Sequence, residues 1–489
     1  MNDFRNSVKG VMVVFLFFFV ALISYIAYFQ AFEAHDLATS NSNGRVIAKK
    51  NEVVRGTIYD RNGNVLAASE KVDTANQTRK YTNGELYVHP LGYASKKYGT
   101  AELEKVYDDE LSTDSTAEGG FKELFKNFSI DSLKKAFQTR DEKEKKIGNG
   151  VITTLDPNVQ QAAFNALGNR KGAVVALDPK TGEILAMVSK PTYDPNNLET
   201  SMAAAVSGSG ENSPLINRAT IGTYPPGSTF KTITTASALQ NISGAKTKVY
   251  EDDGSLEVGT QTINNAEGEA PGDKNLEEAL VESSNVVYGQ IAIDLGNDKL
   301  KATAEKFGFN NDIPTEGFQM SQSKFPSHGK ADKGLIAQSG FGQGEVVATP
   351  MQMALVASTI ANDGVMMQPT LVKEVVDKDK KSVKKIETKK YGQVISSSDA
   401  STIKGYMKEM VNEKLSGVSG FSGLNAAGKT GTADHTDSSG NLKTPHSWFI
   451  SFAPADNPKV AVAVIVEDGG FGAKSAAPVA ATVMKAALK

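Results

Sequence analysis

The chain has 489 residues, and its 53 lysine and arginine residues nearly balance 56 aspartate and glutamate residues, which leaves a net charge of −3. This length favours two to three domains with a sizeable core, and the balanced charge argues against a nucleic-acid partner. The chain contains no cysteine, which excludes disulfides and a cysteine nucleophile. Its five histidines offer few ligands for a histidine-based metal site. If the protein has a catalytic nucleophile, we expect it to be serine, threonine or lysine.

The N-terminus predicts a membrane anchor. Residues 11–29 form a run of 19 positions without a charged side chain, which is long enough to cross a bilayer as a helix. Arg5 and Lys9 precede the run, and the positive-inside rule then places residues 1–9 in the cytoplasm. A cleaved signal peptide or a buried core helix are the alternatives, but the run continues into bulky residues and lacks a small-x-small cleavage site. We expect a transmembrane anchor over residues 10–32 and the remainder outside.

The next part of the chain predicts a separate N-terminal domain. The stretch "RGTIYDRNGNVLAAS", residues 55–69, is typical of two short strands joined at an Asn-Gly turn. The charged passage "TRDEKEKKIGNG", residues 139–150, has the composition of a linker or an exposed loop. We therefore place a domain boundary there, between an N-terminal domain at 33–150 and a main domain at 151–489.

The main domain predicts an α+β fold. Residues 171–189 are typical of a strand, a turn and a strand, and residues 447–453 and 459–467 are apolar runs typical of adjacent buried strands. Helical passages lie between them, for example at 350–364, and a helix of small residues follows from residue 475. The expected architecture is one antiparallel sheet, assembled from distant segments and flanked by helices.

A first candidate for chemistry is "TYPPGSTFK", which precedes an apolar helical face. A helix beginning beside Ser228 places Lys231 three residues later on the same face, where its amine can reach the serine hydroxyl. The helix dipole and burial would lower the lysine pKa and so let it act as a base. The alternative is a serine helix cap with a solvated lysine. The same Ser-x-x-Lys spacing recurs at six other serines: Ser132, Ser243, Ser321, Ser327, Ser382 and Ser401.

A second candidate is "SSN", before the apolar helical stretch that follows it. The hydroxyl of Ser283 can accept and donate a proton, so it could relay one between a base and a leaving group. Asn285 could bond both to Lys231 and to a substrate amide. The alternative for Ser283 is an ordinary helix start.

The tripeptide Lys-Thr-Gly occurs twice, and its context separates the copies. The later copy, Lys429-Thr430-Gly431 followed by Thr432, has small residues on both sides. At a sheet edge its backbone could pair with another chain, and a cation with two hydroxyls suits a substrate carboxylate. The early copy follows Asp178-Pro179 in a turn, and we expect Lys180 to be a solvated tip.

The three motifs "STFK", "SSN" and "KTGT", with their first residues separated by 55 and 146 positions, together resemble the active-site serine penicillin-binding proteins. Further segments, including "RGTIYDRNGNVLA", "NRATIGTYPPGSTFK" and "GFGQGEVVATPMQMA", are similar to class B monofunctional transpeptidases over most of residues 50–489. The resemblance implies a penicillin-binding, serine β-lactamase-like transpeptidase domain at 151–489. It would follow a membrane helix and a small pedestal domain at 33–150.

The resemblance also implies a role for each catalytic residue. Ser228 would be the acylated nucleophile and Lys231 its general base. Ser283 and Asn285 would shuttle protons and hold the substrate, and Lys429 would orient the site electrostatically. No metal or other cofactor is implied.

The later Lys-Thr-Gly copy would bind the substrate. Thr430 and Thr432, on either side of Gly431, would hold the terminal carboxylate of a D-Ala-D-Ala stem peptide, and the backbone N–H groups of Ser228 and Thr432 would form the oxyanion hole. β-Lactams, which mimic the donor, would trap Ser228. A glycosyltransferase domain has no room in this chain, so the resemblance implies a separate membrane polymerase as partner. The catalytic domain would lie on the outer face of a bacterial cytoplasmic membrane, held by a single-pass anchor.

Two other functions stay open from the sequence. A D,D-carboxypeptidase or β-lactam hydrolase shares the three motifs, although no glutamate lies four residues before an asparagine between Ser283 and Lys429, as in class A β-lactamases. A penicillin-binding sensor or scaffold of a cell-wall synthesis complex would also carry an anchor and a pedestal. The chain departs from the family at Ala101-Glu102, where a glycine is usual, and residues 112–148 match nothing in it.

Overall fold

The computed structural model describes residues 2–29, 52–72, 76–113, 146–207, 213–437 and 439–489. The chain forms two compact units. The first comprises Met1–Arg55, Ser69–Thr78 and Ser112–Gly148, and the second comprises Gly56–Ala68, Arg79–Leu111 and Asn149–Lys489. The linker or exposed loop expected at 139–150 and the stretch 112–148 lie mostly outside the described residues.

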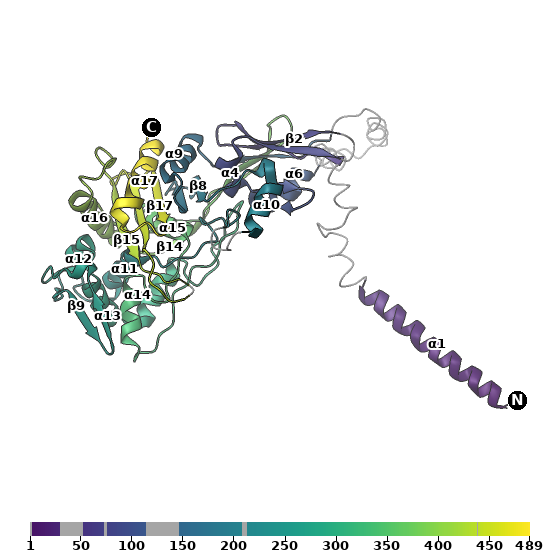
Figure 1. Ribbon diagram of the computed structural model, residues 1–489, viewed down its shortest axis with the longest axis horizontal. Helices are drawn as coiled ribbons and strands as arrows, with labels where there is room; N and C mark the ends of the chain where they lie inside the picture. Colours follow the sequence, from purple (N-terminus) through teal and green to yellow (C-terminus); the bar gives the residue numbers. More distant parts are fainter. Residues whose placement is uncertain (1, 30–51, 73–75, 114–145, 208–212, 438) are drawn as a thin grey trace. The chain divides into compact units, whose positions relative to one another are not determined.

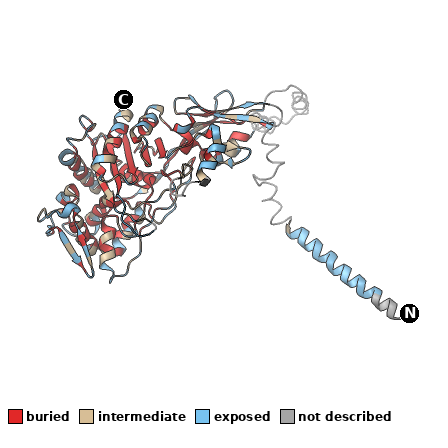
Figure 2. Ribbon diagram, viewed as in Figure 1, coloured by how far each residue is buried: buried red, intermediate tan, exposed pale blue. Residues whose placement is uncertain are grey.

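The first unit contains helix α1 (Asn2–Tyr28). Its segment Val8–Tyr28 has a mean hydropathy of 2.6 and no buried position, and it is long and apolar enough to cross a membrane. Figure 2 shows this helix exposed along its described length. Its exposure argues against the buried core helix among the alternatives, because a core helix hides its apolar side chains.

The second unit is built on a five-stranded antiparallel sheet, as the α+β prediction requires. The strand order is β15 (Ala427–Ala433), β16 (His446–Ala453), β17 (Val460–Val466), β7 (Gly172–Leu177) and β8 (Ile184–Lys190). The predicted hairpin at 171–189 and the adjacent strands near 450 and 463 are confirmed. Since β15 lies at the end of this order, one of its edges has no strand neighbour within the sheet.

Both faces of this sheet are covered by helices, which is why its strands are buried at nearly every position (Figure 1). Alternate residues of β17 belong to two different cores. Helix α15 (Pro350–Ala361) belongs to one core, whereas α17 (Gly472–Ala487) and α9 (Pro157–Leu167) belong to the other. The helices predicted near 350 and after 475 are therefore present, on opposite faces of the sheet.

A second group of elements lies next to β15 and carries two of the three motifs. It comprises η5 (Gly227–Phe230), α11 (Lys231–Asn241), β9 (Ser255–Val258), β10 (Gln261–Asn264), η6 (Ala266–Gly268), α12 (Leu276–Glu282), α13 (Asn285–Lys306), α14 (Lys333–Gly340) and α16 (Ser397–Lys414). Helix α11 packs against α13, and η5 packs against β15.

A six-stranded sheet in the order β13-β12-β6-β1-β2-β3 combines segments that are far apart in the chain. Its strands are β13 (Ser382–Lys385), β12 (Val372–Val376), β6 (Gly150–Thr153), β1 (Ile58–Tyr59), β2 (Val65–Lys71) and β3 (Gln77–Tyr81). The predicted hairpin with Asn62-Gly63 in its turn is present between β1 and β2, where the Asp60 carboxylate accepts the backbone N–H groups of Asn62 and Asn64. The domain boundary at residue 150 stays a prediction.

Short elements complete the fold. They are α4 (Gly84–Leu91), β4 (Ala94–Ser95), β5 (Gly99–Thr100), α5 (Glu102–Val106), α6 (Asp108–Ser112), η3 (Pro195–Asn197), α10 (Leu198–Ser207), β11 (Val365–Met367) and β14 (Lys390–Gln393).

Candidate active site

The predicted helix start at Ser228 is present, but its first turn is a 3₁₀ turn, η5, that continues into α11. Gly227 opens this turn with a φ of +53°, and a Cβ at this position would lie 2.6 Å from the carbonyl oxygen of Thr432. Only glycine combines this backbone conformation with so close an approach. The sequence Pro-Gly before Ser228 therefore sets the serine turn directly against β15.

Lys231 is fully buried one turn later. Its Nζ donates to Asn285 Oδ1 at 2.8 Å, to the backbone carbonyl of Ser283 and to Ser283 Oγ at 3.3 Å. Burial and, second, the positive charge of Lys429 hold the pKa of this amine well below its ordinary value. Among the described residues, no hydrogen bond joins this amine to the Ser228 hydroxyl, although their spacing predicted that the amine could reach it.

Ser283 lies between two helices and does not begin one. It ends α12 in the left-handed conformation with a φ of 63°, and Ser284 caps α13 by accepting the Val287 N–H at 3.0 Å. This bend turns Ser283 Oγ toward the buried amines of Lys231 and Lys429, which lie 3.3 and 2.8 Å away. Because both amines can donate to this oxygen, its own proton is free to point elsewhere.

Lys429 lies in β15 and is also fully buried. Its Nζ donates to Ser283 Oγ and, at 3.2 Å, to the carbonyl of Thr430. Burial, and then the positive charge of Lys414, lowers the pKa of Lys429 to about 7. The later Lys-Thr-Gly copy does lie on a sheet edge, the position at which its backbone could pair with another chain, whereas exposed Lys180 lies in the turn between β7 and β8.

The three motifs meet at one pocket of 720 Å³. Its lining includes six of the eight predicted site residues: Ser228, Ser283, Asn285, Thr430, Gly431 and Thr432. The other two, Lys231 and Lys429, are fully buried and bond to Ser283. The pocket therefore presents hydroxyls, an amide and a strand edge, with two amines immediately behind them.

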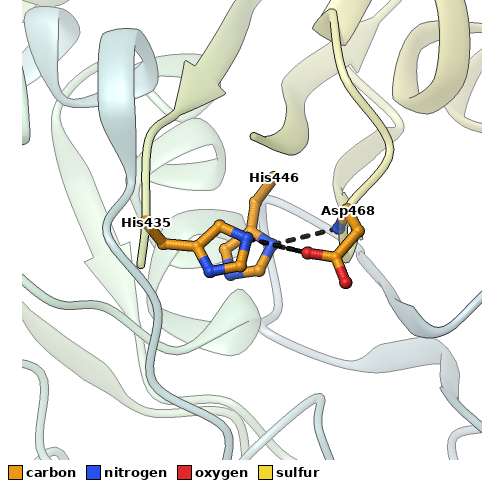
Figure 3. Close-up of side chains that lie close together, drawn as sticks. All are labelled: His435, His446 and Asp468. Atoms are coloured by element: carbon orange, nitrogen blue, oxygen red, sulfur yellow. Dashed lines mark hydrogen bonds and ion pairs between the residues drawn. The ribbon is translucent and has the colours of Figure 1, made fainter. Parts of the chain in front are cut away.

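A histidine pair near the pocket is the one group of potential metal ligands that we find in the described part of the chain. His435, His446 and Asp468 lie together in Figure 3, with their ligand atoms within 4.8 Å of one another and the two rings stacked at 3.7 Å. Two of the five histidines thus meet, which the sequence did not indicate.

The atoms of this cluster that could bind a metal already take part in hydrogen bonds and an ion pair. His435 Nε2 faces two acceptors, Asp468 Oδ1 at 2.7 Å and the Thr444 carbonyl at 3.0 Å, and so carries a hydrogen. The Nδ1 lone pair of His446 accepts the backbone N–H of Asp468 at 3.2 Å, and Lys443 pairs with the Asp468 carboxylate at 3.0 Å. These contacts therefore favour a structural role, in which the cluster holds the end of β15 and the start of β16 together, over a metal site.

Sequence reasoning missed two residues next to the motifs: Asn265, which lines the pocket, and Asp252, which does not. Asn265 follows β10 and binds the "SSN" turn, and buried Asp252 binds Asn265 at 2.7 Å. No motif marks either residue. The only available signal was a pair of adjacent asparagines directly after a short strand.

Comparisons with known proteins agree with this arrangement. Residues 172–485 match the family described as "Penicillin binding protein transpeptidase domain", and residues 55–129 match "Penicillin binding protein A dimerisation domain". The second match includes residues 112–129, so the expectation that 112–148 match nothing in the family is wrong for that part. The chain is 36% identical to the peptidoglycan D,D-transpeptidase PbpA of Mycolicibacterium smegmatis, over 99% of both chains. It is 30% identical to the peptidoglycan D,D-transpeptidase MrdA of Haemophilus influenzae, over 83% of this chain and 68% of the relative.

The fold is also similar to solved structures. The ceftriaxone acyl-enzyme complex of penicillin-binding protein A from M. tuberculosis superposes with a TM-score of 0.79, at 33% identity, and covers 90% of this chain and 100% of that one. The imipenem acyl-enzyme complex of the same protein gives a TM-score of 0.78 with the same identity and coverage.

Proposed function

The chain belongs to the penicillin-binding protein transpeptidase family and is a class B peptidoglycan D,D-transpeptidase, and from this premise we propose that Ser228 is the residue that becomes acylated. The observation that carries the proposal is the hydrogen-bonded set of Lys231, Ser283, Asn285 and Lys429 at the pocket that Ser228 lines. The relatives' common activity favours transpeptidation over a carboxypeptidase, a hydrolase or a non-catalytic scaffold.

In the acylation step, Ser228 Oγ forms a bond to the carbonyl carbon of the penultimate D-Ala of a stem peptide. Its proton passes to neutral Lys231, whose lowered pKa makes that form available. Lys231 gains contact with Ser228 by a small movement, because catalytic hydrogen bonds often shorten only when substrate binds. The bond to the terminal D-Ala nitrogen then breaks, and that nitrogen receives a proton through Ser283.

Thr430, Gly431 and Thr432 hold the donor at the free edge of β15, where an extended peptide can add as a further strand. The two hydroxyls and the Lys429 ammonium bind the terminal carboxylate. The backbone N–H groups of Ser228 and Thr432 receive the developing oxyanion, and the close approach at Gly227 brings these two segments together.

In the second step, an amine of a neighbouring stem peptide attacks the ester carbon. The new amide bond forms, the bond to Ser228 Oγ breaks, and the proton lost by the amine returns to that oxygen through Lys231. A β-lactam follows the first step only, because its ring nitrogen stays attached to the acyl group.

Labelling with a fluorescent penicillin, followed by mass spectrometry of the labelled peptide, tests the assignment in the full-length protein in detergent. We expect Ser228→Ala to abolish the adduct. Ser401→Ala is the matched control, because exposed Ser401 has the same spacing to Lys404 within α16, and it should label as the wild type does. An adduct on another serine in Ser228→Ala would contradict the proposal.

The remaining proposals concern the surroundings of the enzyme. We place the catalytic unit outside the cytoplasmic membrane, with 1–9 inside, 10–32 as the anchor, 33–150 as the pedestal and 151–489 as the transpeptidase domain. We assign the glycan strands to a separate polymerase in the same membrane. Cross-linking in membranes should recover such a polymerase, and its consistent absence would contradict this part.

A further inference from the structure

Asn265 lies behind the "SSN" turn and is 8% exposed. Its Oδ1 accepts the backbone N–H groups of Asn285 at 2.8 Å and Val286 at 3.1 Å, and it lies 3.3 Å from the Ser284 hydroxyl. A single side-chain oxygen thus holds three consecutive residues at the start of α13. These groups begin a helix and would otherwise lack intrahelical partners.

The other end of the same amide is also fixed. Asn265 Nδ2 donates to Asp252 Oδ1 at 2.7 Å and to the Glu269 carbonyl at 3.0 Å. Because the nitrogen faces two acceptors and the oxygen faces three donors, the amide can take only one orientation. Asp252 is fully buried, and its Oδ1 also accepts the Gly254 N–H at 3.2 Å.

Asp252 has a second connection to the site. Its Oδ2 is buried and has no hydrogen-bond partner among the described residues. The negative charge of Asp252 partly offsets the fall in the pKa of Lys231 that burial and Lys429 cause.

The residue before Asn265 orients the Asn285 side chain. The backbone carbonyl of Asn264 accepts Asn285 Nδ2 at 3.0 Å, which leaves Asn285 Oδ1 to accept Lys231 Nζ at 2.8 Å. The end of the β9–β10 hairpin therefore controls both the backbone and the side chain of Asn285. Through that residue it controls the position of the buried amine.

We propose that Asn265, anchored by Asp252, is a positioning residue for transpeptidation, which holds Ser283 and Asn285 where both can accept from Lys231. This inference rests on the proposed roles of Ser228 and Lys231. It assigns the β9–β10 hairpin a role in acylation in addition to lining the pocket.

The test compares full-length variants in detergent by their second-order rate constants for acylation by penicillin and by their thermal midpoints. We expect Asn265→Ala to lower the rate constant about 10- to 100-fold, the cost of a misplaced catalytic group. Asn217→Ala is the control, because Asn217 is also buried but its amide donates to the His89 carbonyl. It should lower the thermal midpoint without this loss of rate.

The pH profile separates positioning from a general loss of stability. Loss of the Asn285 acceptor disfavours the charged form of Lys231, so the acid limb of the acylation profile should move to lower pH in Asn265→Ala and stay in place in Asn217→Ala. Asn265→Asp keeps the volume and the acceptor but opposes Asp252, so it should also be slow. The double variant Asp252→Asn with Asn265→Asp exchanges donor and acceptor and should recover part of the rate.

The outcomes are distinct. A wild-type rate and pH profile in Asn265→Ala would overturn the inference. If the alanine variant does not fold, a wild-type rate in Asn265→Asp would overturn it instead. A wild-type protein that takes no label at Ser228 would instead overturn the proposed function.

Discussion

Two buried lysines share one acceptor in this site, and their charges oppose each other. Lys231 and Lys429 both donate to Ser283 Oγ, and the charge of Lys429 contributes to the low pKa of Lys231. Two ammonium groups in a poorly solvated site repel each other and raise the free energy of the folded protein. This repulsion disappears when one of them loses its proton. The geometry therefore favours a neutral Lys231 as base beside a Lys429 that carries the charge below its own pKa of about 7.

These different protonation states of Lys231 and Lys429 predict that the rate of acylation falls at alkaline pH. Lys429 is protonated below pH 7 and loses its charge as the pH rises through 7, so its attraction for a substrate carboxylate is present on the acid side and lost on the alkaline side. We expect the second-order rate constant for benzylpenicillin to fall above pH 7, by at most about tenfold per pH unit. The benzylpenicillin methyl ester, which lacks the carboxylate, should show no such fall. An equal decline for both compounds would contradict this role of Lys429.

At the scale of residues, the sequence predicted which side chains meet but not what supports them. Ser228, Ser283 and Lys429 could be found because each follows or precedes a recognisable local pattern. The bond from Lys231 to Asn285 was also expected, and it is present at 2.8 Å. Asn265 could not be found, because its role depends on the path of the chain after β10, which no spacing rule describes.

At the scale of elements, the site depends on the close contact between η5 and the edge strand β15. Gly431 lies at this contact, and a Cβ there would lie 2.9 Å from Thr229 Cγ2, 3.0 Å from Trp448 Cβ and 3.1 Å from the Pro226 carbonyl oxygen. Two of these neighbours are backbone or Cβ atoms, which cannot move without shifting their elements. The third belongs to the turn that carries Ser228.

We therefore expect Gly431→Ala to destabilise the protein by about 1–3 kcal/mol, the usual range for an added group in a filled site, and to slow acylation. Gly392→Ala is the matched control, since Gly392 lies in strand β14 with nothing within 4 Å of its added Cβ. Its free energy of unfolding should change by no more than about 0.5 kcal/mol. Thermal unfolding and penicillin labelling of both variants check this, and a stable, fully active Gly431→Ala would contradict the tight contact.

The elements themselves were predictable where their signals are local. The hairpin β7–β8 and the pair β16–β17 follow from apolar runs and turn residues, and the register places them as neighbours. The sheet that joins β1, β6 and β12 was not predicted. Its strands lie about 90 and 220 residues apart in the chain, and short strands encode no partner at that distance.

At the scale of the whole molecule, one helix relates the enzyme to its membrane. The 21 residues of Val8–Tyr28 span about 31 Å at the rise of an α-helix, close to the thickness of a bilayer core. The described part of this helix is exposed along its length, so its apolar side chains need a partner other than protein core. A lipid environment satisfies all of them at once, and Arg5 and Lys9 then favour a cytoplasmic N-terminus.

The absence of cysteine makes this orientation directly measurable, because a single introduced thiol has no background in the chain. Ser7→Cys keeps both basic residues before the span, and Lys180→Cys places a thiol at the exposed tip between β7 and β8. In protoplasts, a membrane-impermeant maleimide should label Lys180→Cys at once and Ser7→Cys only after detergent is added. The parent protein should take no label in either condition. The reverse pattern would place the pocket in the cytoplasm, where it could not reach cross-linked peptidoglycan, and would contradict the proposed orientation.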